Sequence, residues 1–149
     1  VGGEAGDLTI PKVNLEQGPT NARTIAALIG ANLVQSAHDC SDGGLLVAAA
    51  EMAFAGRIGL DLELEKLPTS GNPDPPAAAF AETPSRYLVE IRPDKLDAVK
   101  SHLEGAAAVF AAIGRFADHD RLSLNFKGDS ILNTSLDELR TTWLAPLDW

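Results

Sequence analysis

The stretch "SAHDCSDGGLLVAAAEMAFAG", Ser36–Gly56, constrains the fold of this chain more than any other. Its polar residues end at the pair Gly43 and Gly44, and an apolar, alanine-rich run follows at once. The glycines interrupt an extended segment that is predicted over 33–37, and a helix is predicted over 45–54. Because small side chains on that helix permit close packing, the sequence predicts a helix lying tightly against a sheet.

The rest of the chain alternates between helical and strand patterns. Further helices are predicted over 19–30, 77–81 and 93–104, and the last one follows a capping box formed by Ser135 and Glu138. Further strands are predicted over 58–65, 86–91, 107–116 and 121–126. This order predicts an α/β (α+β) fold, in which helices cover a mixed four- to five-stranded sheet.

One domain is expected over residues 11–149. The segment 1–10 contains three glycines and no hydrophobic period, so it is predicted to be an extended arm that continues from a missing upstream subdomain. The clearest loop is "PTSGNPDPP", residues 68–76, which is rich in proline.

Charge and composition exclude several classes of function. The formal net charge is −9, with 21 acidic and 12 basic residues, and this argues against binding to nucleic acid. No apolar run approaches the ~18 residues of a membrane span, so no membrane association is expected. The single cysteine, Cys40, forms no internal disulfide and fits a reducing compartment. We therefore expect a cytoplasmic protein.

The polar residues before the helix predict an anion site. Backbone N–H groups at a helix start, together with the helix dipole, favour a phosphate, and Gly43 and Gly44 allow it to approach closely. Asp39 and Asp42 would repel a bare phosphate, but they suit a phosphate that carries magnesium. His38 is suited to donate a hydrogen bond or transfer a proton near neutral pH.

A structural alternative exists for each of these residues. Ser41 or Asp42 would fit as the N-cap of the helix, a common role that is worth ~1 kcal/mol. His38 would equally fit as a hydrogen-bonded interior histidine at a strand end. A lone Gly-Gly pair is neither a Walker loop nor a dinucleotide fingerprint, so the loop taken alone does not decide between these interpretations.

A second polar cluster precedes the strand predicted over 86–91. Arg86, beside Ser85, would bind a phosphate or carboxylate through its guanidinium group. Alternatively, Glu82 and Arg86 would pair with each other at the surface, which contributes about 0–1 kcal/mol.

Taken together, these segments resemble the C-terminal part of phosphoribosylformylglycinamidine synthase, a member of the aminoimidazole ribonucleotide synthetase superfamily. The most specific element is the loop His-Asp-x-Ser-Asp-Gly-Gly-Leu, at residues 38–45. The resemblance extends from about Pro11 to Trp143 and places the chain in the second of two related halves. The other matching residues are Glu51, Met52, Gly56, Gly59, Phe80, Glu82, Arg86, Val89, Glu90 and, less distinctively, the segments "IGRF" at 113–116 and "LDELRTTW" at 136–143.

The resemblance implies an ATP-dependent ligase of purine biosynthesis. In that reaction the amide oxygen of formylglycinamide ribonucleotide is phosphorylated, and ammonia from glutamine then displaces the phosphate to give the amidine, with ADP as the second product. The implied cofactors are ATP/ADP and Mg²⁺. The implied site comprises Asp42 and Asp39 as metal ligands, His38 as the catalytic residue, and Ser41, Gly43, Gly44, Arg86 and Glu82 as nucleotide or phosphate contacts.

The implied partners are an upstream nucleotide-binding subdomain, a glutaminase domain or subunit, and the small ribonucleotide substrate. The chain contains neither a glutaminase cysteine with its histidine nor the nucleotide-binding subdomain, so it is expected to be inactive alone. Surface normally covered by the missing neighbour should be apolar, and we expect the fragment to self-associate. Two alternatives stay open: a non-catalytic structural nucleotide-site module of the same enzyme, and a superfamily relative of the selenophosphate synthetase or thiamine monophosphate kinase type.

Overall fold

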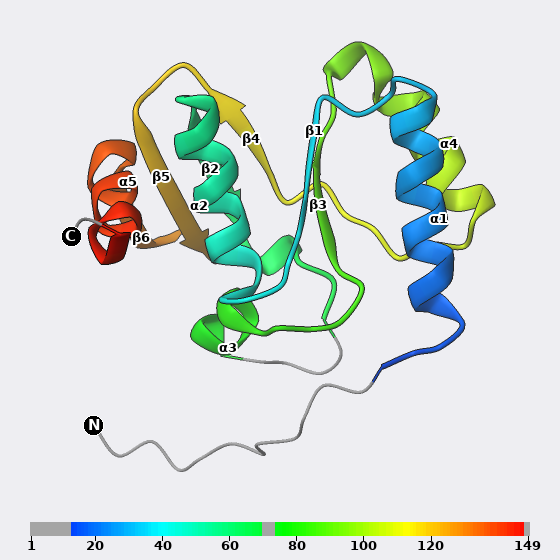
Figure 1. The fold of residues 1–149 in the computed structure, drawn as a ribbon, viewed down its shortest axis with the longest axis horizontal. Coiled ribbons are helices and arrows are strands. Elements are labelled where there is room, and N and C mark those ends of the chain that lie inside the picture. Colours follow the sequence, from blue (N-terminus) through cyan, green and yellow to red (C-terminus); the bar gives the residue numbers. More distant parts are fainter. Residues whose placement is uncertain (1–12, 70–73, 148–149) are drawn as a thin grey trace.

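The computed structural model describes residues 13–69 and 74–147 (Figure 1). The arm predicted over 1–10 lies outside the described residues, as does the centre of the loop predicted over 68–76. The helices of the described chain are α1 (Gln17–Gly30), α2 (Gly44–Gly56), α3 (Pro75–Phe80), α4 (Leu96–Gly105) and α5 (Leu136–Leu144). The strands are β1 (Ser36–Asp39), β2 (Gly59–Glu63), β3 (Tyr87–Glu90), β4 (Gly114–Ala117), β5 (Arg121–Phe126) and β6 (Asp129–Ser135).

The strands form two sheets, and the predicted α/β (α+β) class is confirmed. Four of them make a mixed sheet in the order β4-β2-β5-β6, in which only β2 and β5 run parallel. The other two, β1 and β3, pair antiparallel as a separate ribbon between the four-stranded sheet and the α1–α4 pair (Figure 1). The strand predicted over 107–116 is limited to its end, because β4 begins only at Gly114.

The strand β6 has no counterpart among the predicted elements. It follows β5 through a two-residue turn in which Lys127 and Gly128 both have positive φ, at 53° and 88°. Two positive φ values match the backbone twist of an antiparallel hairpin, so the chain turns back and pairs with β5 as a strand of seven residues.

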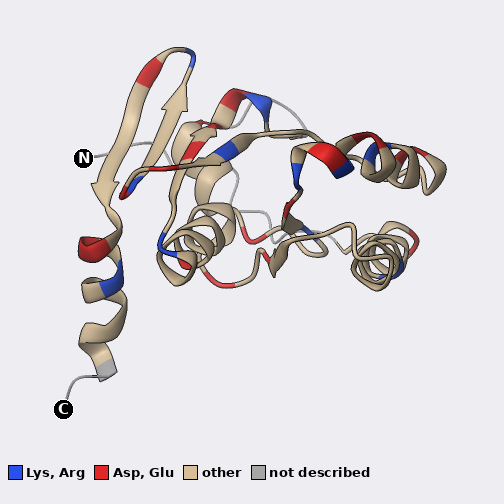
Figure 2. Ribbon diagram, turned by 90° about the horizontal axis from the view of Figure 1, so that it is seen from above, with Lys and Arg blue, Asp and Glu red and all other residues tan. Residues whose placement is uncertain are grey.

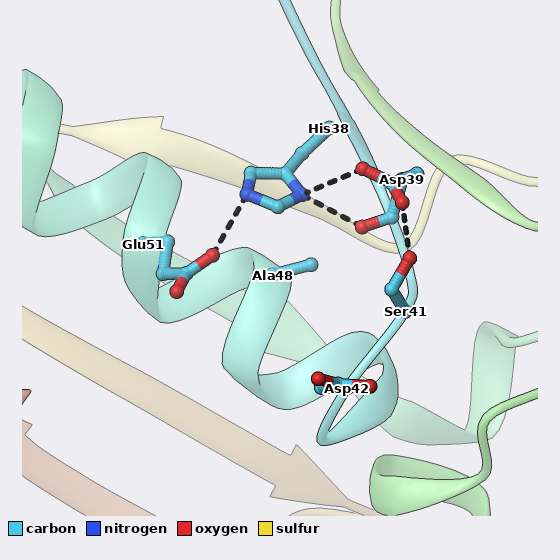
Figure 3. Close-up of a pocket in the computed structure, with 6 residues that line it drawn as sticks. All are labelled: His38, Asp39, Ser41, Asp42, Ala48 and Glu51. Atoms are coloured by element: carbon cyan, nitrogen blue, oxygen red, sulfur yellow. Dashed lines mark hydrogen bonds and ion pairs between the residues drawn. The ribbon is translucent and has the colours of Figure 1, made fainter.

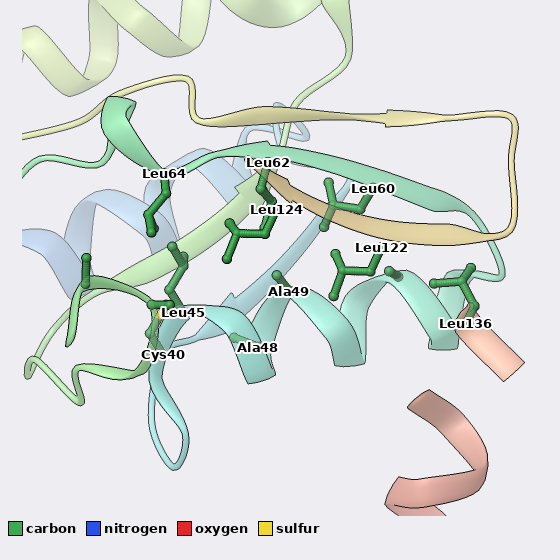
Figure 4. Packing of buried hydrophobic residues seen from close by; sticks show 13 residues of the cluster. Cys40, Leu45, Ala48, Ala49, Leu60, Leu62, Leu64, Leu122, Leu124 and Leu136 are labelled. Carbon is green, nitrogen blue, oxygen red and sulfur yellow. The ribbon is translucent and has the colours of Figure 1, made fainter. Parts of the chain in front are cut away.

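The main core lies between α2 and the four-stranded sheet (Figure 4). The alternation in β2 is confirmed, because Leu60 and Leu62 are buried in this core while Asp61 and Glu63 lie on the other face. Alanines on α2 let the helix lie close to the leucines of the sheet. The buried residues on facing elements include Leu45, Ala48, Ala49, Ala53, Leu60, Leu62, Leu122 and Leu124.

A second, smaller apolar cluster joins α1 to α4 through Leu28, Val99 and Leu103. Leu33 and Val34 pack against this cluster, although both were predicted to belong to the strand over 33–37. Pairing with β3 consequently begins only at Ser36, and the strand extends to Asp39. The shift places His38 inside a strand, opposite Leu88, and leaves residues 40–43 to form the turn.

Charged residues are spread along the whole chain and do not gather in one segment. Figure 2 shows short acidic and basic segments scattered over the helices and strands, with longer uncharged stretches between them. Within residues 13–69 and 74–147, no helix is both long and apolar enough to cross a membrane.

Asp61 on β2 links the stability of the fold to pH. A hydrogen bond from Ser123 is the main reason why the pKa of Asp61 lies below its ordinary value of 3.8, and His119 and Arg115 add to the effect. A carboxyl group with a lowered folded-state pKa stabilises the fold above its unfolded pKa, and this stabilisation is lost as pH falls through the folded pKa. In Asp61→Asn we therefore expect the unfolding free energy to decrease less steeply than in the wild type as pH falls below about 4.

Urea unfolding at a series of pH values measures this effect. Ser123→Ala is expected to give part of the same change, because it removes the main hydrogen-bond donor to the carboxylate. If the unfolding free energy fell equally steeply with decreasing pH in the wild type and in Asp61→Asn, the proposed role of Asp61 would be contradicted.

Candidate functional site

The end of β1 and the start of α2 enclose a cavity of about 200 Å³ (Figure 3). Its lining residues are His38, Asp39, Ser41, Asp42, Ala48 and Glu51. Four of the predicted site residues therefore meet at one opening: His38, Asp39, Ser41 and Asp42. The geometry follows from the local sequence, because the turn at Gly43 and Gly44 sends the chain from the strand directly into the helix.

Both ring nitrogens of His38 have oxygen partners. Nε2 lies 2.8 Å from Oε2 of Glu51, and Nδ1 lies 2.7 Å from the backbone carbonyl oxygen of Asp39. The alternative interpretation of His38, as a hydrogen-bonded interior histidine at a strand end, is right about the hydrogen bonds and the position near the end of β1. It is wrong about an interior position, because 33% of the side chain is exposed and the ring faces the cavity (Figure 3).

Asp39 and Asp42 both lie at the surface and line the same cavity. The Ser41 hydroxyl donates a hydrogen bond to Asp39, and this bond is the main reason why the pKa of Asp39 lies below its ordinary value of 3.8. Asp39 is therefore an anion at neutral pH. Neither Ser41 nor Asp42 caps α2, whose N-cap is Gly43 with no side-chain hydrogen bond, so the capping alternative is wrong.

The two glycines at the helix start have positive φ, 75° at Gly43 and 65° at Gly44. The Gly43 N–H group donates to Oε1 of Glu82 at 2.9 Å, and the Gly44 N–H group donates to the backbone oxygen of Ser41. Glu82 thus places a carboxylate oxygen at the start of α2, where the N–H groups and the helix dipole favour an anion.

Arg86 lies apart from the cavity lining. Its guanidinium group donates to the backbone oxygen of Ala81 at 3.4 Å and to the Thr83 hydroxyl at 3.1 Å. These bonds brace the turn before β3. Among the described residues no ion pair joins Glu82 to Arg86, so the surface-pair alternative is wrong, and Glu82 instead spans to the loop before α2.

Glu51 lines the cavity although sequence reasoning gave it no role. It lies one helical turn after Ala48 on α2, on the face that is directed at His38 (Figure 3). The signal for it was present, because Glu51 is the single charged residue in the helix "GLLVAAAEMAFAG". A lone carboxylate in an apolar helix requires a polar partner, and His38 provides one.

A larger and more apolar cavity of about 590 Å³ adjoins the first. The two cavities share His38 and Glu51, so these residues lie between a carboxylate-lined opening and an apolar one. Aromatic rings contribute to the walls of the larger cavity, from Phe54, Phe116 and Trp143.

The donor set fits a magnesium ion that is bound partly by its ligand. Residues 13–69 and 74–147 contain no group of three or more metal-ligating side chains. Mg²⁺ is commonly held by one or two carboxylates together with phosphate oxygens and water. Asp39 and Asp42, exposed at one cavity, match that smaller requirement.

Cys40 takes no part in this chemistry. Its side chain is 5% exposed in the main core, and burial raises the pKa of the thiol above its ordinary value of 9.0. A buried and protonated thiol is a poor nucleophile.

The chain matches the family model described as AIR synthase related protein, C-terminal domain, over residues 2–127. Curated relatives named phosphoribosylformylglycinamidine synthase subunit PurL are 31% identical over 93% of this chain in Aquifex aeolicus, 37% over 87% in Thermococcus gammatolerans and 34% over 97% in Deinococcus radiodurans. The chain spans 17–18% of the length of these relatives.

Solved structures with the same fold include Thermotoga maritima PurL complexed with FGAR, with a TM-score of 0.81 and 18% identity over 93% of this chain and 23% of that one. The same protein complexed with ATP gives a TM-score of 0.74 over 80% of this chain and 21% of that one. The hydrogenase maturation protein HypE of E. coli is less similar, with a TM-score of 0.60 over 76% of this chain and 39% of that one.

Proposed function

The chain belongs to the family of the AIR synthase related protein, C-terminal domain, and from this premise we propose that it is the C-terminal subdomain of the second half of a phosphoribosylformylglycinamidine synthase. The whole enzyme would convert formylglycinamide ribonucleotide, ATP and ammonia to the amidine, ADP and phosphate. The observation that carries the proposal is the grouping of His38, Asp39, Ser41 and Asp42 around one open cavity, in a chain whose relatives bear that enzyme's name.

Each of these four residues has a proposed role. Asp39 and Asp42 hold Mg²⁺, which would supply positive charge to the phosphate oxygens of a bound nucleotide. Ser41 keeps the Asp39 carboxylate in place through its hydroxyl group. His38, one-third exposed and held by Glu51 at Nε2, donates a hydrogen bond or a proton to the reacting groups by exchanging the contact of Nδ1 with the Asp39 carbonyl oxygen for one with the ligand.

The start of α2 contributes the phosphate contacts. The Gly43 N–H group already holds a carboxylate oxygen of Glu82, which supports an anionic ligand at this helix end. We propose that a phosphate oxygen shares or replaces this contact, while Gly44, which has no Cβ, lets the helix start pack against the backbone of Phe80 and Ala81. Arg86 acts from the second cluster by bracing the turn that carries Glu82.

The contact between Glu82 and Gly43 also favours a second candidate function. A carboxylate that satisfies the helix start without any ligand is suited to a non-catalytic module, in which a nucleotide site serves assembly and stability. The two candidates differ in whether removing the carboxylates affects turnover or only stability.

The proposed partners are the upstream nucleotide-binding subdomain, a glutaminase domain or subunit and the ribonucleotide substrate; the enzyme is proposed to be cytoplasmic. The fold is shared with the structure of PurLQS from Thermotoga maritima.

Self-association of the isolated chain stays a prediction, which is supported by large apolar side chains at the surface. The most exposed of these are Val109 at 75% and Leu15 at 81%.

Turnover assays test the proposed function. The enzyme that contains this chain is expected to release ADP when supplied with ATP, formylglycinamide ribonucleotide and ammonia, and to release none without the ribonucleotide. The 149-residue chain alone is expected to give no ADP, since it spans 18% of the length of its relative from Aquifex aeolicus. Ribonucleotide-dependent turnover by the isolated chain, or none by the enzyme, would contradict the proposal.

A further inference from the structure

The carboxylate of Glu51 is held between two side chains that come from different elements. Its Oε1 accepts a hydrogen bond from the indole N–H group of Trp143 on α5, at 2.9 Å. Its Oε2 lies 2.8 Å from Nε2 of His38 on β1. Trp143 and His38 are thereby joined through one residue of α2, although they lie 105 positions apart in the sequence.

The two contacts together determine the orientation of the imidazole. A carboxylate that accepts a hydrogen bond at one oxygen has less freedom to rotate, so the position of the other oxygen is restrained. Because His38 also contacts the backbone oxygen of Asp39 through Nδ1, its ring is held from both sides. Without the indole N–H group, Glu51 would be free to turn toward water, and His38 would lose one of its two restraints.

Trp143 is well placed for this role because the indole is anchored. Its ring packs against Phe54 with centroids 5.7 Å apart and an angle of 51° between the planes. Phe54 follows Glu51 by three residues on α2, so the tilted ring contact and the hydrogen bond lie on one helix face. At the other end of α5, Leu136 is buried in the main core and fixes the helix.

We propose that Trp143 is a positioning residue, which orients His38 toward the cavity through Glu51. The inference rests on the proposed function, since it gives this orientation a role in turnover. It also extends the site from the loop before α2 to the helix α5, which lies beyond the residues 2–127 that the family model matches.

Trp143→Phe tests the proposal, because it keeps an aromatic ring against Phe54 and removes the N–H donor. In the enzyme that contains this chain, we expect kcat to fall about tenfold with KM within about twofold, as found for residues that orient a functional side chain. In the isotope-labelled 149-residue chain, we expect the ring ¹⁵N signals of His38 to shift and broaden. The signals of His102 and His119, which have no contact with Glu51, should stay unchanged.

Thr142→Val is the matched control on the same helix. It removes a hydroxyl group that bonds only to the backbone oxygen of Glu138, and we expect no change in kcat or in the His38 signals. His38 signals that stay unchanged in Trp143→Phe would overturn the proposal even if the enzyme lacked the proposed activity. Shifted signals with an unchanged kcat would overturn the catalytic part, and no turnover by the wild type would count against the proposed function instead.

Discussion

Gly44→Ala is expected to lower the unfolding free energy of the chain by about 2 to 5 kcal/mol, the sum of backbone strain and a steric clash. Gly44 has a φ of 65°, which strains any residue that carries a Cβ. An added Cβ would also lie 2.7 Å from the carbonyl carbon of Phe80 and 2.8 Å from the backbone oxygen of Ala81. Backbone atoms cannot rotate away as a flexible side chain can, so α2 and the turn after α3 would have to separate.

Denaturant unfolding measures the effect, and Gly30→Ala is its control. Gly30 ends α1 with open space where the Cβ would be, so this substitution is expected to change stability by less than about 1 kcal/mol. Equal stability of Gly44→Ala and the wild type would show that the helix start is not as tightly packed as described.

Asp39→Asn combined with Asp42→Asn is expected to lower kcat of the enzyme that contains this chain about 100-fold, or about 2.7 kcal/mol. The two amides keep the size of the side chains but lose the negative charges that would attract Mg²⁺. Both side chains are at the surface, so their removal should leave the melting temperature nearly unchanged. Steady-state turnover and thermal unfolding of the same protein preparations give both quantities.

Asp97→Asn serves as the control for that experiment. Asp97 lies in the first turn of α4, is exposed and does not line the cavity, so its replacement should leave kcat unchanged. If the double variant kept full activity but melted at a lower temperature, the carboxylates would serve the fold, and the non-catalytic module would be the better account.

The sequence predicted those parts of the fold that local patterns determine. The alternating leucines of β2, the capping serine of α5 and the alanine-rich α2 were all predicted near their observed positions. Ser135 does accept a hydrogen bond from the Glu138 N–H group, at 3.2 Å. The grouping of His38, Asp39, Ser41 and Asp42 at one cavity is also a local feature, because these residues are close in sequence and a single turn brings them together.

Contacts between distant elements could not be predicted in the same way. The bond between Glu82 and Gly43 spans 39 positions, and that between Trp143 and Glu51 spans 92. No periodicity of a single segment encodes either contact. The strand β1 was displaced for the same reason, because Leu33 and Val34 pack against residues of α1 and α4 that are remote from the local pattern.

The central claim is that the loop before α2 holds a phosphate through magnesium. Calorimetric titration of ADP into the enzyme that contains this chain, over a series of Mg²⁺ concentrations, tests it most directly. We predict that Mg²⁺ strengthens ADP binding to the wild type and that Asp42→Asn weakens it about tenfold at saturating Mg²⁺ but not in its absence. Identical ADP affinities for the wild type and the variant at every Mg²⁺ concentration would contradict the account.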